Sequence, residues 1–240
     1  MQRLSQQQIE RWITTPRFSA FLNETNNDVD SALALYDWNV CMSAVFFELV
    51  SYSEVILRNA IDAQFQPMNH AEMAQNSWLA DPALLNQRSI DEVLAAEQRL
   101  GFENKSPTRA RVVAGLSFGF WRALINKQYK QLWISHLHPA FPNGTGDRSE
   151  VSKLLARINP FRNRLAHHDP IIRADVSARH DDLLELVGLI DHDAADWLAR
   201  RSAVPDILAW RPPLTRGQKI RASLGSGPDS IRFHQRLRSS

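Results

Sequence analysis

Apolar residues recur at steps of three and four positions along most of this chain, which is the period of an α-helix rather than of a β-strand. The longest such pattern predicts a helix over about residues 28–65, and Pro67 ends it. The period therefore predicts an all-α protein. The stripe expected to face the core is Leu33, Tyr36, Val40, Ala44, Phe47, Val50, Leu57, Ile61 and Phe65.

Capping and helix-ending residues divide the rest of the chain into further helices. Ser106-Pro107 combines a capping residue with proline at the first helical position. Asp147 and Glu150 have the spacing of a capping box. The expected helices span about residues 84–100, 107–124, 148–158, 160–168 and 176–200.

The amino-acid composition agrees with the prediction of an all-α protein and limits the number of domains. Glycine is scarce, with 9 residues in 240, where about 7% is usual. A chain of this length with 44% hydrophobic residues is expected to form one domain, over residues 1–210. After residue 210 proline, glycine and serine become frequent, which predicts a flexible tail over 211–240.

Charge is distributed unevenly between these two parts. The whole chain has a net charge of only +2, which does not by itself indicate a nucleic-acid-binding protein. Residues 211–240 contain seven basic residues and one acidic residue, so the tail carries +6 and the first 210 residues carry −4. A basic tail of this kind commonly contacts phosphate groups. It could equally be a solubilising or partner-binding end.

The single cysteine, Cys41, excludes an intrachain disulfide framework and a cysteine-based metal centre. The longest nearly apolar stretch, residues 40–50, contains Glu48 and is shorter than the roughly 20 residues that cross a bilayer. The N-terminal residues lack the apolar core of a signal peptide. We therefore expect a cytoplasmic protein with no membrane contact.

The densest cluster of chemically active side chains is NPFRNRLAHHDP, residues 159–170. Asn163 and His167 are four positions apart on the predicted short helix and so share a face, with Arg162 about 100° to the side. Histidine titrates near neutral pH, and arginine can hold the phosphoryl oxygens as negative charge develops. These groups suffice for metal-independent cleavage of an RNA phosphodiester.

The same residues have a purely structural interpretation. Arg162, Arg164 and Asp169 could form surface ion pairs, and the two histidines could simply end a helix, whose dipole favours cations at that end. Spacing alone does not decide between this interpretation and a catalytic one.

The segment RNRLAHH, residues 162–168, resembles the R-x4-6-H signature of the HEPN superfamily of helical ribonucleases. In this form it looks like the Abi-like (abortive-infection) family within that superfamily. The resemblance extends over about residues 4–190. Upstream blocks follow in the family's order: ALALYDWN at 32–39, then Phe47, EVILRNAID at 54–62 and LSFGFWRAL at 116–124.

This resemblance implies a HEPN-like helical bundle with additional helices that forms a homodimer. Two motifs would face each other across a cleft and cleave RNA without a metal or cofactor, in a toxin or phage-defence role. An antitoxin or regulatory partner would accompany such an enzyme. Matched residue by residue, Arg162 is the motif arginine, Asn163 the polar residue after it and His167 the motif histidine, although His168 also satisfies the spacing.

The sequence departs from the family pattern at two places. Asn159-Pro160 precedes the motif directly, where the family would have an uninterrupted helix, so the angle of the motif helix is open. Many members carry a modifiable tyrosine just after the motif, whereas this chain has Asp169-Pro170. That mode of control is therefore not expected.

The upstream block adds an acidic residue to the candidate site. Continuing the stripe of the first long helix places Glu54 where the core or an interface should lie, and a buried carboxylate needs a partner. Arg58, one turn further, is the local candidate, and an arginine or histidine of the motif helix is the other. Asn59 stands beside Arg58, so Glu54, Arg58 and Asn59 are additional candidate site residues.

Two other patterns are set aside. Residues 115–119 match the G-x-S-x-G pattern of serine hydrolases, but Ser117 is expected inside a helix and no alternating strands are present to build the parent sheet. The histidines and aspartates near 136–138 and 191–193 lack the spacing of metal ligands. No metal site is therefore predicted.

The sequence thus favours an endoribonuclease that leaves a 2′,3′-cyclic phosphate and a 5′-hydroxyl. The alternative is a non-catalytic helical module that binds RNA or acts as a dimeric regulator. Residues expected to contact RNA outside the motif core are Arg164, Arg216, Lys219 and Arg221.

Overall fold

The computed structural model describes residues 4–65 and 72–215. All regular secondary structure in these ranges is helical, and they contain no β-strand, only one isolated bridge between Met73 and Thr108. The prediction of an all-α protein is confirmed.

The chain forms two compact units, which are described separately below. Of the described residues, one unit contains 4–33 and 213–215, and the other contains 34–65 and 72–212. The expected division at residue 210 into a body and a flexible tail stays a prediction, because residues 216–240 lie outside the described part of the chain.

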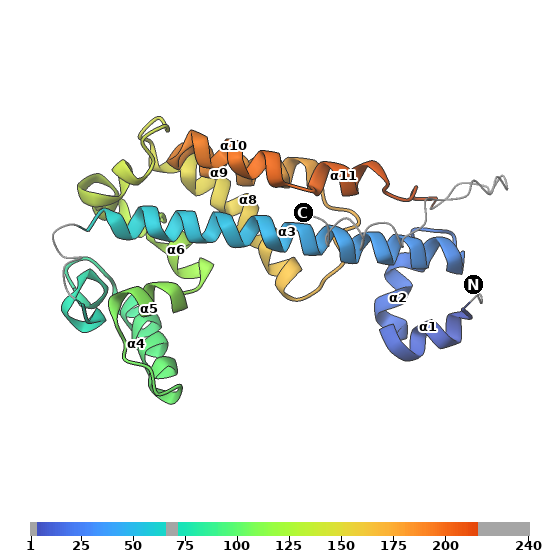
Figure 1. Cartoon of the computed structure of the whole chain (residues 1–240), viewed down its shortest axis with the longest axis horizontal. Coiled ribbons are helices and arrows are strands. Elements are labelled where there is room, and N and C mark those ends of the chain that lie inside the picture. The colour runs from blue at the N-terminus through green and yellow to red at the C-terminus, as the bar shows by residue number, and fades with distance from the viewer. Residues whose placement is uncertain (1–3, 66–71, 216–240) are drawn as a thin grey trace. The chain divides into compact units, whose positions relative to one another are not determined.

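The smaller unit contains two short helices, α1 (Gln6–Ile13) and α2 (Thr15–Leu22), drawn in blue in Figure 1. The side chain of Ser5 and that of Gln8 form a reciprocal capping box at the start of α1. The Thr215 amide donates a hydrogen bond to the Glu24 carbonyl at 2.8 Å, which attaches residues 213–215 to this unit. Its apolar core consists of Ile9, Phe18, Phe21 and Leu22.

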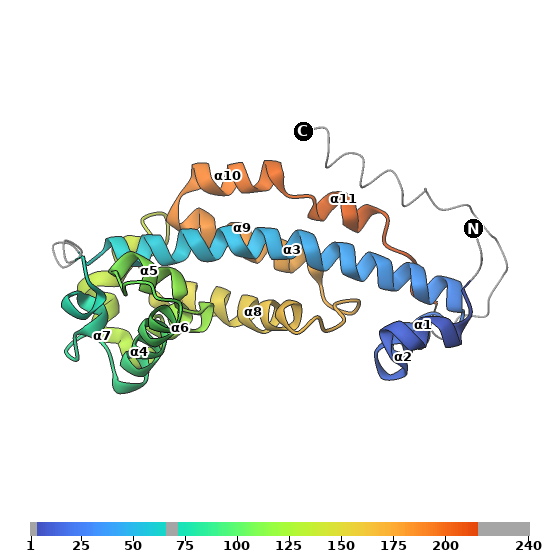
Figure 2. The same ribbon diagram turned by 60° about the horizontal axis from the view of Figure 1, so that its bottom comes forward.

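The larger unit is organised around α3 (Val29–Ala63), from residue 34 onward. This 35-residue helix confirms the first predicted element. The helices α8 (Arg148–Ala166), α9 (Val176–Ile190), α10 (His192–Arg201) and α11 (Val204–Ala209) lie beside it in Figures 1 and 2. An edge-to-face contact between Phe46 and Phe161, with ring centroids 4.7 Å apart, joins α3 to α8.

The predicted stripe on α3 is correct only in its second half. Val50, Leu57, Ile61 and Phe65 are buried as expected, whereas Val40, Ala44 and Phe47 are exposed. The first half of α3 is apolar on two sides, and the core takes the side with the larger side chains. The buried face there is Leu35, Trp38, Met42, Phe46 and Leu49.

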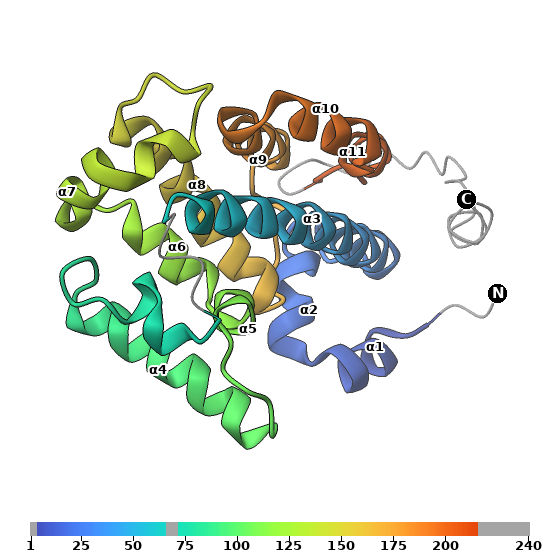
Figure 3. The ribbon, with the colours of Figure 1, turned by 60° about the vertical axis from the view of Figure 1, so that its left-hand side comes forward.

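On the side of α3 opposite α10 and α11 lie α4 (Gln87–Phe102), α5 (Arg109–Gly115) and α6 (Phe118–Leu124), as Figures 1 and 3 show. The aromatic rings of this part form one cluster with stacked, tilted and edge-to-face contacts. Its members are Phe65, Trp78, Phe120 and Trp121. The remaining turns are η2 (Ala74–Asn76), η3 (Trp78–Ala80), η4 (Lys127–Tyr129), α7 (Lys130–Leu132), the π-helical η5 (Trp133–Leu137) and η6 (His138–Ala140).

Two predicted helices are each divided into two in the structure. The helix expected over 107–124 is interrupted at Leu116, and the Ser117 hydroxyl caps α6 by accepting from the Phe120 amide at 3.3 Å. The helix expected over 176–200 is broken at Asp191, whose extended backbone and side chain cap α10. In both cases a small polar residue offers the backbone a local hydrogen bond that competes with helix continuation.

The short helix expected over 160–168 is the last part of a continuous 19-residue helix, α8. Asp147 caps α8, but the predicted capping box does not form, because the Glu150 carboxylate accepts hydrogen bonds from Thr145 instead. Pro160 lies inside it on the exposed side, while Ile158, Phe161 and Leu165 are buried. Burial of this face on both sides of the proline outweighs the hydrogen bond that proline cannot donate.

By length and composition, α3 is apolar enough to cross a membrane, with a mean hydropathy of 1.7 over its most apolar window. The core helix of a soluble protein passes the same test, and α3 supplies the core residues named above. The expected cytoplasmic location without membrane contact stays a prediction.

Candidate functional site

The candidate site is built where the last turns of α8 pack against the middle of α3 (Figure 2). The Arg162 guanidinium lies 3.9 Å from the Glu54 carboxylate, measured from Nη2 to Oε2. The side chain of Arg162 remains 33% exposed, whereas that of Glu54 is only 19% exposed. The structure thus brings together two predicted site residues that are far apart in the sequence, and it leaves the arginine accessible.

Glu54 occupies a half-buried position with several favourable partners. Burial raises the pKa of its carboxyl above the ordinary value, because the charged form loses solvation. Arg162, Arg58 and a hydrogen bond from the Phe118 amide act in the opposite direction, and burial prevails. The Glu54 carboxylate thus lies within ion-pair distance of Arg162 at the contact between α3 and α8.

The exposed end of α8 carries the remaining motif residues. Asn163 and His167 are exposed, and the His167 amide donates to the Asn163 carbonyl at 3.0 Å, so both residues lie one turn apart on the same face. His167 directly follows Ala166, the last residue of α8, and is the C-terminal cap of that helix. Its imidazole therefore lies at the exposed C-terminal end of the helix.

His168 has a distinct role in the backbone. It adopts a left-handed conformation with φ of 54°, and the Asp169 amide donates back to the Arg164 carbonyl at 2.8 Å. This is the geometry of a Schellman motif, a position where glycine is usual. The Arg164 side chain donates to the Pro170 carbonyl at 2.8 Å and so braces the same turn.

Two features next to this turn were not predicted from the sequence. The buried side chain of Asn39 on α3 accepts a hydrogen bond from the Ile171 amide at 2.8 Å, which ties the segment after the motif to the core. The His168 ring lies 6.5 Å from that of Phe47, which is 38% exposed. An internal asparagine in an apolar helical pattern is the only sequence signal for the first feature.

Of the other predicted site residues, Arg58 lies near Glu54, Asn59 is exposed, and those of the tail are not described by the structure. Arg58 donates to the Ala114 carbonyl at 3.2 Å and contributes to the field at Glu54. Asn59 is exposed on α3. The predicted RNA-contacting residues of the tail, Arg216, Lys219 and Arg221, lie outside the described residues.

The directions of Arg162 and His167 limit what one chain can do. Five residues at about 100° each place their side chains roughly 140° apart around α8. Arg162 is turned toward α3 and Glu54, whereas His167 lies at the exposed end of the helix. A substrate that uses both groups must span them, or a second copy must supply one of them.

The two patterns set aside from the sequence remain without support. Ser117 caps a helix instead of lying inside one, and the described residues contain no strand that could form the elbow of a serine hydrolase. Within residues 4–65 and 72–215 no three histidine, cysteine, aspartate or glutamate side chains are grouped as metal ligands.

Comparisons of the chain with protein-family models, with curated proteins and with solved structures found no match. The resemblance of residues 162–168 and the upstream blocks to the Abi-like HEPN family therefore stays a prediction.

Proposed function

We propose that this protein is a metal-independent endoribonuclease of the HEPN type, with a toxin or phage-defence role in the cytoplasm. The observation that carries the proposal is the end of α8, where the Arg162 guanidinium forms a 3.9 Å ion pair with Glu54 and is partly exposed, and where Asn163 and His167 lie at the surface one turn apart. A cation, an amide and an imidazole are the groups that RNA cleavage by internal attack requires.

In the proposed reaction the His167 imidazole accepts the proton of a ribose 2′-hydroxyl. The 2′-oxygen forms a bond to the adjacent phosphorus, and the bond from phosphorus to the 5′-oxygen breaks. A proton returned to that oxygen gives a 5′-hydroxyl, and the other product ends in a 2′,3′-cyclic phosphate. Arg162 stabilises the charge on the non-bridging oxygens, and Asn163 orients the phosphate.

Glu54 serves as a positioning residue in this scheme. Its carboxylate is held between Arg162 and Arg58 and accepts from the Phe118 amide. A guanidinium that is oriented before the substrate arrives loses less conformational freedom on binding. Replacing Glu54 by glutamine should therefore lower the rate constant of cleavage more than the affinity for RNA.

The exposed apolar side of α3 supports a homodimer around the same site. Val40 and Phe47 are 50% and 38% exposed, and Phe47 lies beside His168 at the end of the motif. A dimer that covers this side would bring a second motif next to the first, so that Arg162 of one copy and His167 of the other share one RNA strand.

The test is incubation of the full chain, in EDTA, with a labelled structured RNA and with DNA of the same sequence. We expect cleavage of RNA only. His167→Ala should lower the rate by about 100-fold or more, which is the usual contribution of general acid–base catalysis. His192→Ala, an exposed histidine of α10, is the matched control and should leave the rate unchanged.

Two further readouts make this test specific. The rate should change between about pH 5.5 and 7.5, because histidine titrates in that range. Arg162→Lys should lose most activity although it keeps the charge, because lysine lacks the planar fork that binds two phosphate oxygens. Intact RNA at high protein concentration, with a folded protein, would overturn the proposal.

The second candidate is a non-catalytic module that binds RNA or regulates as a dimer. The pairing of Arg162 with Glu54 favours it, since an arginine that mainly locks two helices needs no substrate. RNA that is retained but uncut, with binding weakened by Arg164→Ala as much as by Arg162→Ala, would support this function instead.

A further inference from the structure

A pocket of about 230 Å³ lies away from the motif, between α4, α6 and the turn that follows α6. Figure 3 shows α4 and α6 on the same side of α3. The volume corresponds to about seven or eight liquid water molecules, so the pocket can hold a solute larger than a bare phosphate ion. Its lining side chains are mostly polar: Arg88, Ser89, Glu92, Ser117, Arg122, Asn126 and Gln128.

Arg122 is the distinctive member of this lining. Its Nε atom is buried and has no hydrogen-bond partner. Within residues 4–65 and 72–215 no carboxylate forms an ion pair with its guanidinium. A half-buried cation without a counter-charge is unfavourable, and a bound anion would remove that penalty.

The rest of the lining has the composition of an anion site. Two arginines and one glutamate give it a net charge of +1. Glu92 lies 3.6 Å from Arg88, so the acidic residue is directed to the exposed arginine and not to Arg122. The Ser117 oxygen accepts from the Phe120 amide, which leaves its hydroxyl hydrogen to donate, and Asn126 and Gln128 add amide donors.

We propose that this pocket binds a small molecule that carries a phosphate group. An arginine fork, a hydroxyl and two amides from three segments of the chain converge on it, and a phosphate offers enough acceptor oxygens to use them together. A carboxylate, with two oxygens, would be satisfied by Arg122 alone. This inference does not depend on the proposed ribonuclease activity.

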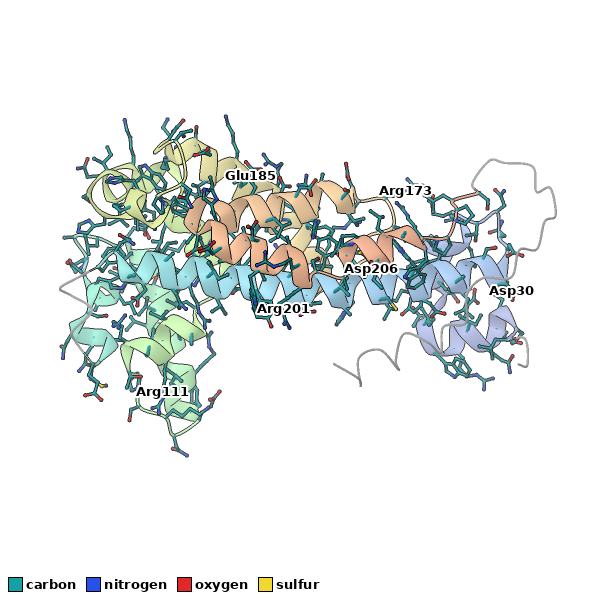
Figure 4. The ribbon with its side chains drawn as sticks, turned by 45° about the horizontal axis from the view of Figure 1, so that its top comes forward. Asp30, Arg111, Arg173, Glu185, Arg201 and Asp206 are labelled. Atoms are coloured by element: carbon teal, nitrogen blue, oxygen red, sulfur yellow. The ribbon has the colours of Figure 1, made fainter. Side chains whose placement is uncertain are left out.

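The test is isothermal titration of the full chain with inorganic phosphate, with adenosine 5′-monophosphate and with acetate. Arg122→Gln should weaken phosphate-group binding by about tenfold or more, as expected for the loss of a charged hydrogen bond. Arg111→Gln is the matched control, because Arg111 is exposed on α5 outside the pocket, where Figure 4 labels it. That variant should bind like the wild type.

Arg88→Gln provides a second variant that cannot disturb the core, since the Arg88 side chain is 88% exposed. We expect it to weaken binding severalfold, with a smaller effect than Arg122→Gln. Tighter binding of the nucleotide than of phosphate would identify a phosphate ester as the ligand, and equal binding would identify the free ion. Binding of acetate as tight as that of phosphate, no binding of either phosphate probe, or equal weakening by Arg111→Gln would each overturn the proposal.

Discussion

Replacing Pro160 by alanine is expected to stabilise the protein, although the proline lies in the motif helix. Pro160 is inside α8 and exposed, so its removal creates no cavity. Proline inside a helix is about 3 kcal/mol less favourable than alanine. This difference already includes the restriction that proline imposes on the unfolded chain. The expected gain in the free energy of unfolding is therefore about 3 kcal/mol.

The assay is urea and thermal denaturation of the full chain, followed by circular dichroism at 222 nm. For a protein of this size, about 3 kcal/mol corresponds to a rise in Tm of roughly 6–12 °C. The control is Pro205→Ala, because Pro205 is also exposed but lies in the first turn of α11, where no helical hydrogen bond is lost. That variant should be unchanged or less stable by up to about 1 kcal/mol.

The reasoning is refuted if Pro160→Ala is no more stable than Pro205→Ala. That result would mean that the backbone around residue 160 has a geometry which alanine cannot relax into a regular helix. The stability prediction holds whether or not the protein cleaves RNA.

Three further changes test the site. Glu54→Gln should raise the free energy of unfolding at pH 7, because burial raises the carboxyl pKa and disfavours the charged form. The difference in stability between the variant and the wild type should shrink as the pH falls and Glu54 becomes protonated, which urea denaturation from pH 4 to 8 would measure. Asn39→Ala should lower that free energy by about 1–3 kcal/mol, since the buried Ile171 amide loses its acceptor, and should speed hydrogen exchange at Ile171. His168→Gly should be more stable than His168→Ala by about 1 kcal/mol in the same denaturation assay, because only glycine adopts the left-handed backbone without strain.

The features that could be predicted from the sequence are those fixed by local patterns. An uninterrupted helical period followed by Pro67 predicts α3, and the Asp147 cap predicts the start of α8. Ser117 and Pro160 show why other boundaries could not be predicted. A serine inside an apolar period is compatible with a helix interior or with a cap, and the choice depends on packing elsewhere in the fold. At Pro160 the burial of neighbours on both sides overrides the local preference.

The same distinction applies to the candidate site. The one-turn spacing of Asn163 and His167 can be read from the sequence, because it depends only on helix geometry. The pairing of Glu54 with Arg162 needs the tertiary contact between α3 and α8, and the sequence left Arg58 as an equal candidate. The pocket around Arg122 could not be predicted, since three segments of the chain line it and the patterns that the sequence shows at residues 115–124 do not indicate an anion site.

The hydrogen bond between Asn39 and Ile171 also constrains when activity can arise during synthesis. Its two residues are 132 positions apart. At a translation rate of about 5–20 residues per second, α3 emerges from the ribosome roughly 7–26 s before the segment that covers it. The part of α3 that α8 and the segment after it cover is exposed during this interval, and the motif at the end of α8 has not yet been made. A partner that binds this part of nascent α3 would therefore act before the candidate site is assembled.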